Sequence, residues 1–153
     1  MYCPACHYDD TKVIDSRVGA DDFIVRRRRE CAKCEFRFST QEQIEILNLS
    51  IIKRDGSREP YSREKLEKGL RRAFEKRPIN SEDFSKLVNN IEIDIQLKKK
   101  SEVTSQEIGE IVMRHLRKVD QVAYIRFASV YRDFADIETF QEEIGTLLKK
   151  KRS

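Results

Sequence analysis

The four cysteines of this chain are its strongest structural constraint. They form two Cys-x-x-Cys pairs separated by 24 residues, Cys3 with Cys6 and Cys31 with Cys34. Each pair can turn its two sulfurs toward one point, so two pairs brought together offer four thiolates in a tetrahedral arrangement. Because protein would fill all four positions, the spacing predicts a structural zinc ion, one per chain, in a zinc ribbon.

Other chemistries share parts of this pattern. Four thiolates can hold an iron–sulfur cluster, Cys-x-x-Cys can be a redox dithiol, and residues 3–7 spell the attachment sequence of c-type haem. The sequence has no apolar run near the roughly 20 residues that cross a bilayer and no secretory signal. We therefore expect a cytoplasmic protein with no membrane partner, where exported haem proteins and disulfides are disfavoured. His7 is expected to be a bystander.

Residues 1–46 are expected to form a small β module around the cysteines. Two strand-like stretches, residues 11–18 and 22–29, are joined around Gly19, and a hairpin there would return Cys31 to Cys6. A module of about 45 residues has too little core to fold alone, so metal binding should supply much of its folding free energy. Phe36 and Phe38 are expected to pack in its small core.

The positive charge of this module is concentrated in one place. The whole chain carries a net charge of only +4, and residues 1–46 contain eight Lys and Arg against nine Asp and Glu. However, Arg26 to Arg29 are consecutive and lead directly into the second cysteine pair. Successive residues of a strand alternate between faces, so at least two of these arginines share a face.

Double-stranded DNA is the partner that this arginine run favours. The guanidinium fork fits both phosphate and the guanine edge, so backbone contacts would give affinity while one or two arginines read bases. A solvated charge run is the alternative interpretation. The candidate DNA-binding residues are Lys12, Arg17, Arg26, Arg27, Arg28, Arg29 and Arg37.

The remaining chain is expected to be a hairpin followed by helices. Two short extended runs flank Asp55-Gly56, a strong hairpin signal. The apolar periodicity and cap residues then predict helices that begin at Ser62, at Ser81, at a Thr104–Glu107 capping box and near Asp120. A last amphipathic helix carries Ile137, Phe140, Ile144 and Leu147, and leads into a basic tail. Val119 and Ile137 are both expected to face inward.

Basic residues surround the hairpin and the first helix start. Lys53, Arg54, Arg58 and Lys65 could hold a phosphate together with a helix N-terminus, although the sequence has no Gly-rich P-loop. A solvated basic hairpin is the plainer interpretation of the residues alone. No catalytic residues are expected, because zinc would consume all four thiols and the two histidines, His7 and His115, are far apart in sequence.

Several segments in order resemble a known family. The four-cysteine ribbon with "VIDSR" and "RRRREC", followed by "IIKRDGSREPYSREKL" and "VAYIRFASVYRDF", looks like the bacterial regulators of ribonucleotide reductase. The resemblance implies an α+β chain: a zinc ribbon over residues 1–46, a mainly helical ATP-cone domain with an N-terminal β-hairpin over 47–140, and a helix end and tail over 141–153. It also implies a repressor of promoter boxes upstream of ribonucleotide reductase operons.

The resemblance further implies the ligands and their site. ATP and dATP would act as regulatory ligands, with Mg²⁺ as a candidate companion ion, and nucleotide state would set the size of a homo-oligomer. The nucleotide-binding residues implied by the cone motif and its surroundings are Ile51, Lys53, Arg54, Glu59, Lys65, Thr104, Tyr124 and Tyr131. For the two tyrosines, plain core packing stays open.

Overall fold

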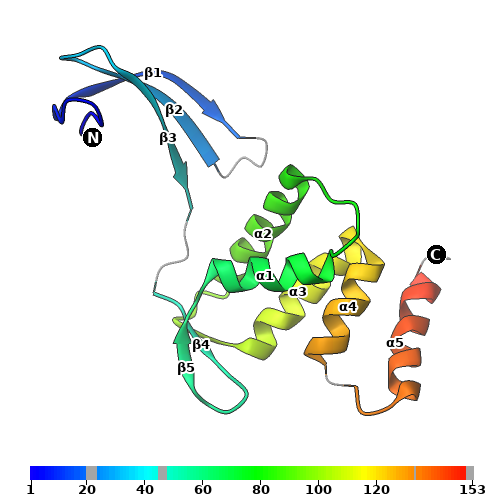
Figure 1. The fold of residues 1–153 in the computed structure, drawn as a ribbon. Helices are drawn as coiled ribbons and strands as arrows, with labels where there is room; N and C mark the ends of the chain where they lie inside the picture. The colour runs from blue at the N-terminus through cyan, green and yellow to red at the C-terminus, as the bar shows by residue number, and fades with distance from the viewer. Residues whose placement is uncertain (20–23, 45–47, 133, 151–153) are drawn as a thin grey trace. The chain divides into compact units, whose positions relative to one another are not determined.

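The chain divides into two compact units, Met1–Glu45 and Ile46–Ser153. The computed structural model describes residues 1–19, 24–44, 48–132 and 134–150. The first unit is made of strands and the second mainly of helices (Figure 1). The fold class is therefore α+β, as the sequence predicts. The connection expected around Gly19 lies partly outside the described residues.

The first unit is a three-stranded antiparallel sheet. Strands β1 (Thr11–Val18), β2 (Ile24–Cys31) and β3 (Arg37–Gln43) lie side by side in that order. Among the described residues of this unit, only Cys3 and Cys31 are buried. Phe36 is 46% exposed, so its expected place in a core is wrong. With almost no apolar core, the sheet depends on the cysteines at its end.

A β-bulge at Ile14 sets which residues of β1 share a face. The register shifts between Val13 and Asp15, so Asp15 lies opposite Arg28 while Lys12 lies opposite Glu30. Residues directly opposite each other project to the same face of a sheet. The extra residue of a bulge therefore moves Lys12 to the face that it would otherwise miss.

The second unit begins with a small mixed sheet. Strands β4 (Ser50–Ile52) and β5 (Arg58–Pro60) form an antiparallel hairpin, and β6 (Glu102–Thr104) pairs with β4 in parallel. The expected turn at Asp55-Gly56 is confirmed: Gly56 has φ +83°, a conformation that favours glycine. The long-range pairing of β6 was not predicted.

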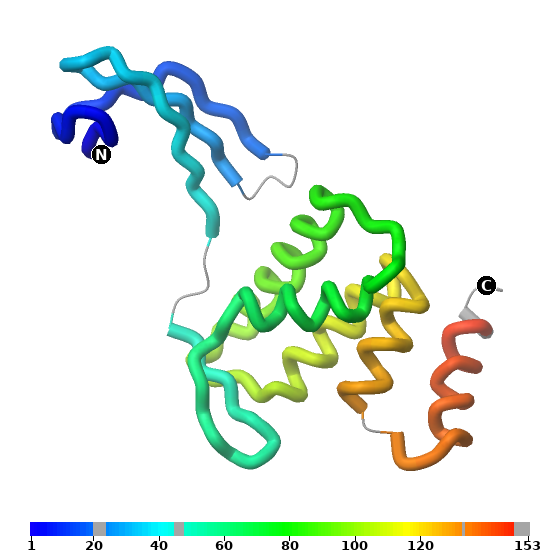
Figure 2. The backbone as a smooth tube through the Cα atoms, viewed as in Figure 1, coloured from blue at the N-terminus to red at the C-terminus, as the bar shows by residue number. Residues whose placement is uncertain are grey.

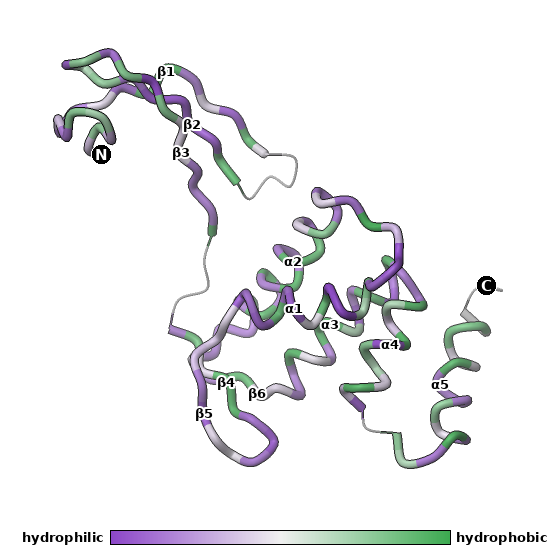
Figure 3. Tube along the Cα trace, in the orientation of Figure 1, coloured by the Kyte–Doolittle hydropathy of each residue, from purple (hydrophilic) through white to green (hydrophobic). Residues whose placement is uncertain are grey.

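Within its described residues, the second unit is completed by five helices. They are α1 (Arg63–Ala73), α2 (Ser81–Gln96), α3 (Ser105–Val119), α4 (Gln121–Tyr131) and α5 (Ile137–Lys150). Helices α1 to α4 enclose the core, and α5 lies beside α4 (Figure 2). Hydrophobic and hydrophilic residues are interspersed along the helices, as expected for helices that bury one face (Figure 3). No helix in the described part of the chain has the length and hydropathy of a membrane span.

Most of the expected inward-facing residues lie in the core, with two exceptions. Leu70, Val88, Ile91, Val112 and Leu116 are completely buried. Val119 is 52% exposed and Ile137 is 79% exposed, so their predicted burial is wrong. Val119 is the last residue of α3 and Ile137 the first of α5. At these ends the apolar face of the helix extends beyond the neighbouring elements that cover the rest of it.

The helix starts follow the cap residues, with one correction. The Ser62, Thr104 and Asp120 side chains accept hydrogen bonds from the first turns of α1, α3 and α4. Asn80, rather than the predicted Ser81, caps α2 by accepting from the backbone N–H of Asp83 at 2.7 Å. The Thr104–Glu107 capping box is confirmed, with both of its reciprocal hydrogen bonds present.

The capping box predicts an acid-sensitive contribution to stability. The backbone N–H of Thr104 and the Lys100 ammonium group lower the pKa of Glu107 from 4.5 to about 2. Because folding lowers this pKa, the stabilisation is present above pH 4.5 and is lost as the pH falls toward about 2. Glu107→Gln should reduce the free energy of unfolding by about 1 kcal/mol at neutral pH and by less in acid.

Urea denaturation followed by far-UV circular dichroism would measure this difference. Glu64→Gln is the matched control, because Glu64 also lies in a first helical turn but has no hydrogen-bond partner in the described structure. An equal loss in both variants, or a Glu107→Gln loss that does not shrink in acid, would contradict the assignment.

Candidate metal centre, basic face and cavity

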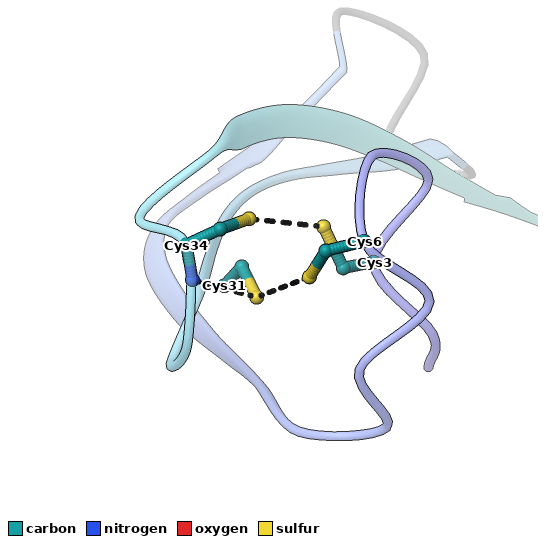
Figure 4. Close-up of side chains that lie close together, drawn as sticks. All are labelled: Cys3, Cys6, Cys31 and Cys34. Atoms are coloured by element: carbon teal, nitrogen blue, oxygen red, sulfur yellow. Dashed lines mark hydrogen bonds between the residues drawn. The ribbon is translucent and has the colours of Figure 1, made fainter.

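The four cysteine sulfurs converge at one end of the β sheet. The Cys3 and Cys34 Sγ atoms are 3.6 Å apart, as are those of Cys6 and Cys31, and all four lie within 4.8 Å of one another. Figure 4 shows the side chains of the two turns pointing toward each other. A tetrahedral zinc ion with bonds of about 2.3 Å separates its sulfurs by about 3.8 Å. The cluster therefore fits zinc in both ligand type and spacing.

The two cysteine turns repeat the same backbone geometry. In the first, the His7 N–H donates to the Cys3 carbonyl at 2.9 Å; in the second, the Glu35 N–H donates to the Cys31 carbonyl at 3.1 Å. His7 and Glu35 both have positive φ, 57° and 56°. The His7 side chain is exposed and outside the four-sulfur cluster, so this residue shapes the turn instead of binding the metal.

Backbone amides prepare Cys31 to act as a thiolate ligand. The N–H groups of Cys34 and Lys33 point at the Cys31 sulfur, at 3.5 and 3.4 Å. The hydrogen bond from Cys34, which is the largest effect, lowers the pKa of Cys31 from 9.0 to about 7 in spite of burial. A thiol that is easily deprotonated binds a metal at neutral pH with less proton cost.

The arginines of β2 divide between the two faces of the sheet. Arg26 and Arg28 are exposed on one face, where Arg17 lies opposite Arg26 and Asp15 lies opposite Arg28. Within the described residues, Arg26 and Arg28 have no ion-pair or hydrogen-bond partner. We name this surface the arginine face, and its basic residues are Lys12, Arg17, Arg26, Arg28 and Arg37.

The arginine face keeps a positive excess. Its acidic residues are Asp15 and Glu30, which pair with Arg17 at 3.0 Å and with Arg37 at 2.6 Å. Both pairs lie at the surface, where they contribute little and can exchange partners. An anion that approaches this face therefore meets Arg26 and Arg28, which have no partner among the described residues.

Arg27 and Arg29 lie on the opposite face and are engaged within the sheet. Arg27 pairs with Glu42 of β3 at 2.9 Å. Arg29 donates to the Thr40 hydroxyl at 3.4 Å and to the carbonyl and hydroxyl of Thr11 at 3.5 and 3.4 Å. Arg29 therefore connects β1, β2 and β3, and the geometry does not join these two residues to the arginine face.

The second unit contains a cavity of about 950 Å³ between the hairpin, α1, α3 and α4. Six of the sequence-predicted nucleotide residues line it: Ile51, Lys53, Arg54, Glu59, Lys65 and Tyr131. Further apolar side chains come from α1, α3 and α4, among them Leu66, Ile108 and Phe127. Such a cavity offers cations at one side and an apolar surface for a flat ring at another.

Glu59 holds two lysines at the hairpin side of this cavity. Its Oε2 atom lies 2.6 Å from Lys65 Nζ and 2.9 Å from Lys53 Nζ. The hydrogen bonds from Lys65 and Lys53 lower the pKa of Glu59, and the same contact raises the pKa of Lys53. Both lysine side chains are therefore already gathered at one point.

Thr104 and Tyr124 are not among the residues that line this cavity. Thr104 is occupied in the capping box, and the neighbouring Ser105 lines the cavity instead. Tyr124 is 3% exposed, and its hydroxyl donates to Glu143 of α5. The structure thus favours a structural role for Thr104 and core packing for Tyr124.

Three further cations at the cavity were missed by the sequence reasoning. They are Arg72 and Lys76, on and just beyond α1, and Arg126 of α4. Arg126 donates to the backbone carbonyl of Glu75, which ties α4 to the chain after α1. The basic run "RRAFEKR" weakly indicated Arg72 and Lys76, but only the packing of α4 on α1 brings Arg126 close to that run.

Comparisons with known proteins identify both units. Residues 1–42 match the family model described as "Transcriptional repressor NrdR-like, N-terminal domain", and residues 49–137 match the one described as "ATP cone domain". Together with the four-cysteine cluster, the first match supports a structural zinc ion. The second supports nucleotide binding. The class of protein is therefore a regulator that joins a zinc ribbon to an ATP-cone.

Similar proteins from three bacteria align over nearly the whole chain. All are named "Transcriptional repressor NrdR": from Acetivibrio thermocellus (51% identity over 99% of this chain and 100% of the relative), Listeria monocytogenes serotype 4a (49% over 99% of both) and Finegoldia magna (48% over 96% and 98%). This chain belongs to the NrdR family of transcriptional repressors, which are regulators and not enzymes. The predicted family and regulatory role are confirmed.

The cysteine cluster predicts that the first unit requires its metal. Metal analysis should find one zinc per chain, and a strong chelator should unfold the sheet while the helices stay folded. The reason is that structural zinc supplies roughly 10 kcal/mol or more in small metal-dependent modules, and the described residues of this sheet form almost no other core. Amide NMR dispersion would follow the sheet, and far-UV circular dichroism the helices.

His7→Asn serves as the control for this experiment. Asparagine tolerates the positive φ of this position, and His7 lies outside the cluster. The variant should keep a full zinc content. Strand signals that survive complete metal removal would contradict the prediction.

Proposed function

We propose that this chain is a nucleotide-sensing repressor of ribonucleotide reductase operons. Residues 1–46 would bind paired promoter boxes, residues 47–140 would bind ATP and dATP, and residues 141–153 would form a C-terminal helix end and tail. The observation that carries the proposal is the coexistence of two anion-accepting surfaces in one chain: the arginine face on β2 and the cationic cavity behind the hairpin.

The arginine face is the proposed DNA-binding surface. Arg26 and Arg28 would make the central contacts, with Lys12, Arg17 and Arg37 around them. Their lack of partners among the described residues supports this role, because unpaired guanidinium groups gain most from phosphate and guanine acceptors. Arg27 and Arg29, which the sequence also suggests, would act by bracing the sheet from the other side.

The cavity is the proposed nucleotide site. Lys53 and Lys65 would take the phosphates, displacing Glu59, and Arg54 would add a further cation. Tyr131 and Phe127, whose rings stack at 5.9 Å, offer a surface for the base. Two acidic residues, Glu59 and Glu75, line the cavity, and Mg²⁺ would act as a companion of the phosphates.

Oligomerisation would connect the two sites. One ribbon offers few phosphate contacts, so a single unit should bind DNA weakly. Two ribbons held one helical turn or a multiple apart bind together with greatly raised affinity. A nucleotide that binds one oligomeric form better than another therefore switches repression without touching the ribbon. With dATP as the signal of sufficient DNA precursor, dATP would favour the DNA-binding form.

The first prediction separates the two faces of the sheet. Arg28→Gln should weaken binding to a promoter duplex by about fivefold to a hundredfold and, for a phosphate contact, reduce the slope of affinity against salt by about one. Arg27→Gln is the matched control, a neighbouring arginine on the opposite face. It should leave the affinity nearly unchanged. Fluorescence anisotropy at several salt concentrations, with zinc content checked, would measure both.

An equal loss in the two variants would contradict the assignment of faces. No binding by the unaltered protein, with or without nucleotides, would overturn DNA recognition and favour a ribbon that docks on a protein partner.

The second prediction tests the nucleotide site and its effect on DNA. Lys65→Gln should weaken nucleotide binding by about tenfold or more, because it removes a charged phosphate ligand. Lys68→Gln is the control, since Lys68 lies one turn further along α1 and does not line the cavity. Isothermal titration calorimetry would give both affinities.

The same variants should differ in their DNA response. In the unaltered protein and Lys68→Gln, adding dATP to ATP-loaded protein should tighten binding to the duplex at fixed salt. Lys65→Gln should need a higher nucleotide concentration for the same effect. DNA binding that ignores nucleotide in all three would leave a DNA-binding ribbon and would contradict nucleotide control.

A further inference from the structure

The last turn of α4 faces the cavity on one side. Arg54 of the hairpin donates to the backbone carbonyl of Tyr131, and its guanidinium group lies 5.7 Å from the centre of the Tyr131 ring. The Tyr131 hydroxyl in turn donates to the Gln106 carbonyl at 2.6 Å. Arg54, which lines the cavity, is therefore hydrogen-bonded to the end of α4, 77 residues later in the chain.

Gly109 gives the Tyr131 ring its place. A Cβ atom at Gly109 would lie 2.0 Å from the ring, closer than any real contact, so the ring occupies the space of the missing side chain. The ring is also stacked on Phe127 and tied through its hydroxyl, and it cannot turn aside without losing these contacts. Tyr131 is thus held in one position between the cavity and α3.

The next residue, Arg132, holds α5. Its guanidinium group lies 2.6 Å from Glu143 and 3.8 Å from Glu110. Glu143 also accepts from the hydroxyl of the buried Tyr124 and is only 13% exposed. These contacts and the buried Leu147 dock the helix. Two consecutive residues of one helix end therefore face different elements, the nucleotide cavity and α5.

No described residue of α5 lines the cavity, but α5 contacts α4, which does line it. The match to the ATP-cone family ends at residue 137, where α5 begins. The outward side of α5 exposes Leu148 at 60% and, at its start, Ile137 at 79%. A helix that is held by a few side-chain contacts and is apolar on its outer side can respond when its attachment point moves.

We propose that the end of α4 couples the nucleotide cavity to α5, so that nucleotide binding and α5 docking oppose each other. The inference rests on the proposed nucleotide site. A phosphate is a stronger acceptor for a guanidinium group than a neutral carbonyl. A bound nucleotide therefore draws Arg54 away from Tyr131, which loosens the last turn of α4 and with it the grip of Arg132 on Glu143. Tyr131 and Arg132 act as positioning residues.

Hydrogen exchange of the full-length, zinc-loaded protein tests the first half of the coupling. Adding ATP or dATP should speed amide exchange in peptides that cover α5, by about fivefold or more, while the core of α2 stays protected. Unchanged or slowed exchange in α5, under conditions where calorimetry shows that nucleotide is bound, would overturn the inference and leave the proposed function standing.

Linkage supplies the second half of the test. If nucleotide loosens α5, then loosening α5 must tighten nucleotide binding by the same factor. Glu143→Gln should raise nucleotide affinity by about fivefold or more, although Glu143 does not line the cavity. Glu142→Gln is the matched control, because Glu142 precedes Glu143 in α5 and its own carboxylate has no partner in the described structure. Equal affinities in the two variants would overturn the coupling.

The two proposals fail in different ways. Absence of nucleotide binding in the unaltered protein would overturn the proposed function together with the coupling. Normal binding with an unresponsive α5 would overturn the coupling alone. Gly109→Ala tests the coupling at Tyr131. The added methyl group should displace the Tyr131 ring and speed amide exchange in α5 before any nucleotide is added.

Discussion

Coordination of the four cysteine sulfurs is the constraint on which the first unit depends. Within the described residues, this sheet buries little besides Cys3 and Cys31, so hydrophobic packing cannot fix its strands. Both cysteine turns repeat one set of backbone hydrogen bonds, and Cys31 is itself the last residue of β2. The four-cysteine cluster therefore fixes the direction of the Cys31 side chain at the end of β2. Because side chains alternate along a strand, Arg26 and Arg28 share one face and Arg27 and Arg29 the other.

The sequence predicts what local spacing and cap chemistry determine. The cysteine cluster, the Asp55-Gly56 hairpin and the capping box of α3 each depend on residues close together in the chain. Strand alternation was also predictable, but the membership of the arginine face was not. The bulge at Ile14 brings Lys12 to the arginine face, and Glu42 of the neighbouring strand binds Arg27 on the opposite face.

The residues of the cavity also differ in whether nearby sequence or only tertiary packing determines their position. The hairpin residues Lys53, Arg54 and Glu59 belong to one short motif, and all three line the cavity. Tyr124 and Tyr131 lie on one helix, but their different neighbours decide which tyrosine faces the cavity and which is buried under α5. Arg126 reaches the cavity only through the packing of α4, and no periodicity in α4 alone could reveal that.

The bulge at Ile14 has a consequence for how this fold can change over evolutionary time. Point substitutions on the exposed strands alter one side chain and leave the others in place. In a regular ladder, loss of one residue reverses the side-chain direction of all residues on one side of the deletion, as side-chain direction has a period of two. Loss of Ile14 would instead turn the bulge into a regular ladder, leaving Lys12 opposite Glu30 and Asp15 opposite Arg28. We therefore expect β1 to tolerate the loss of one residue better than the regularly paired β2 and β3 do.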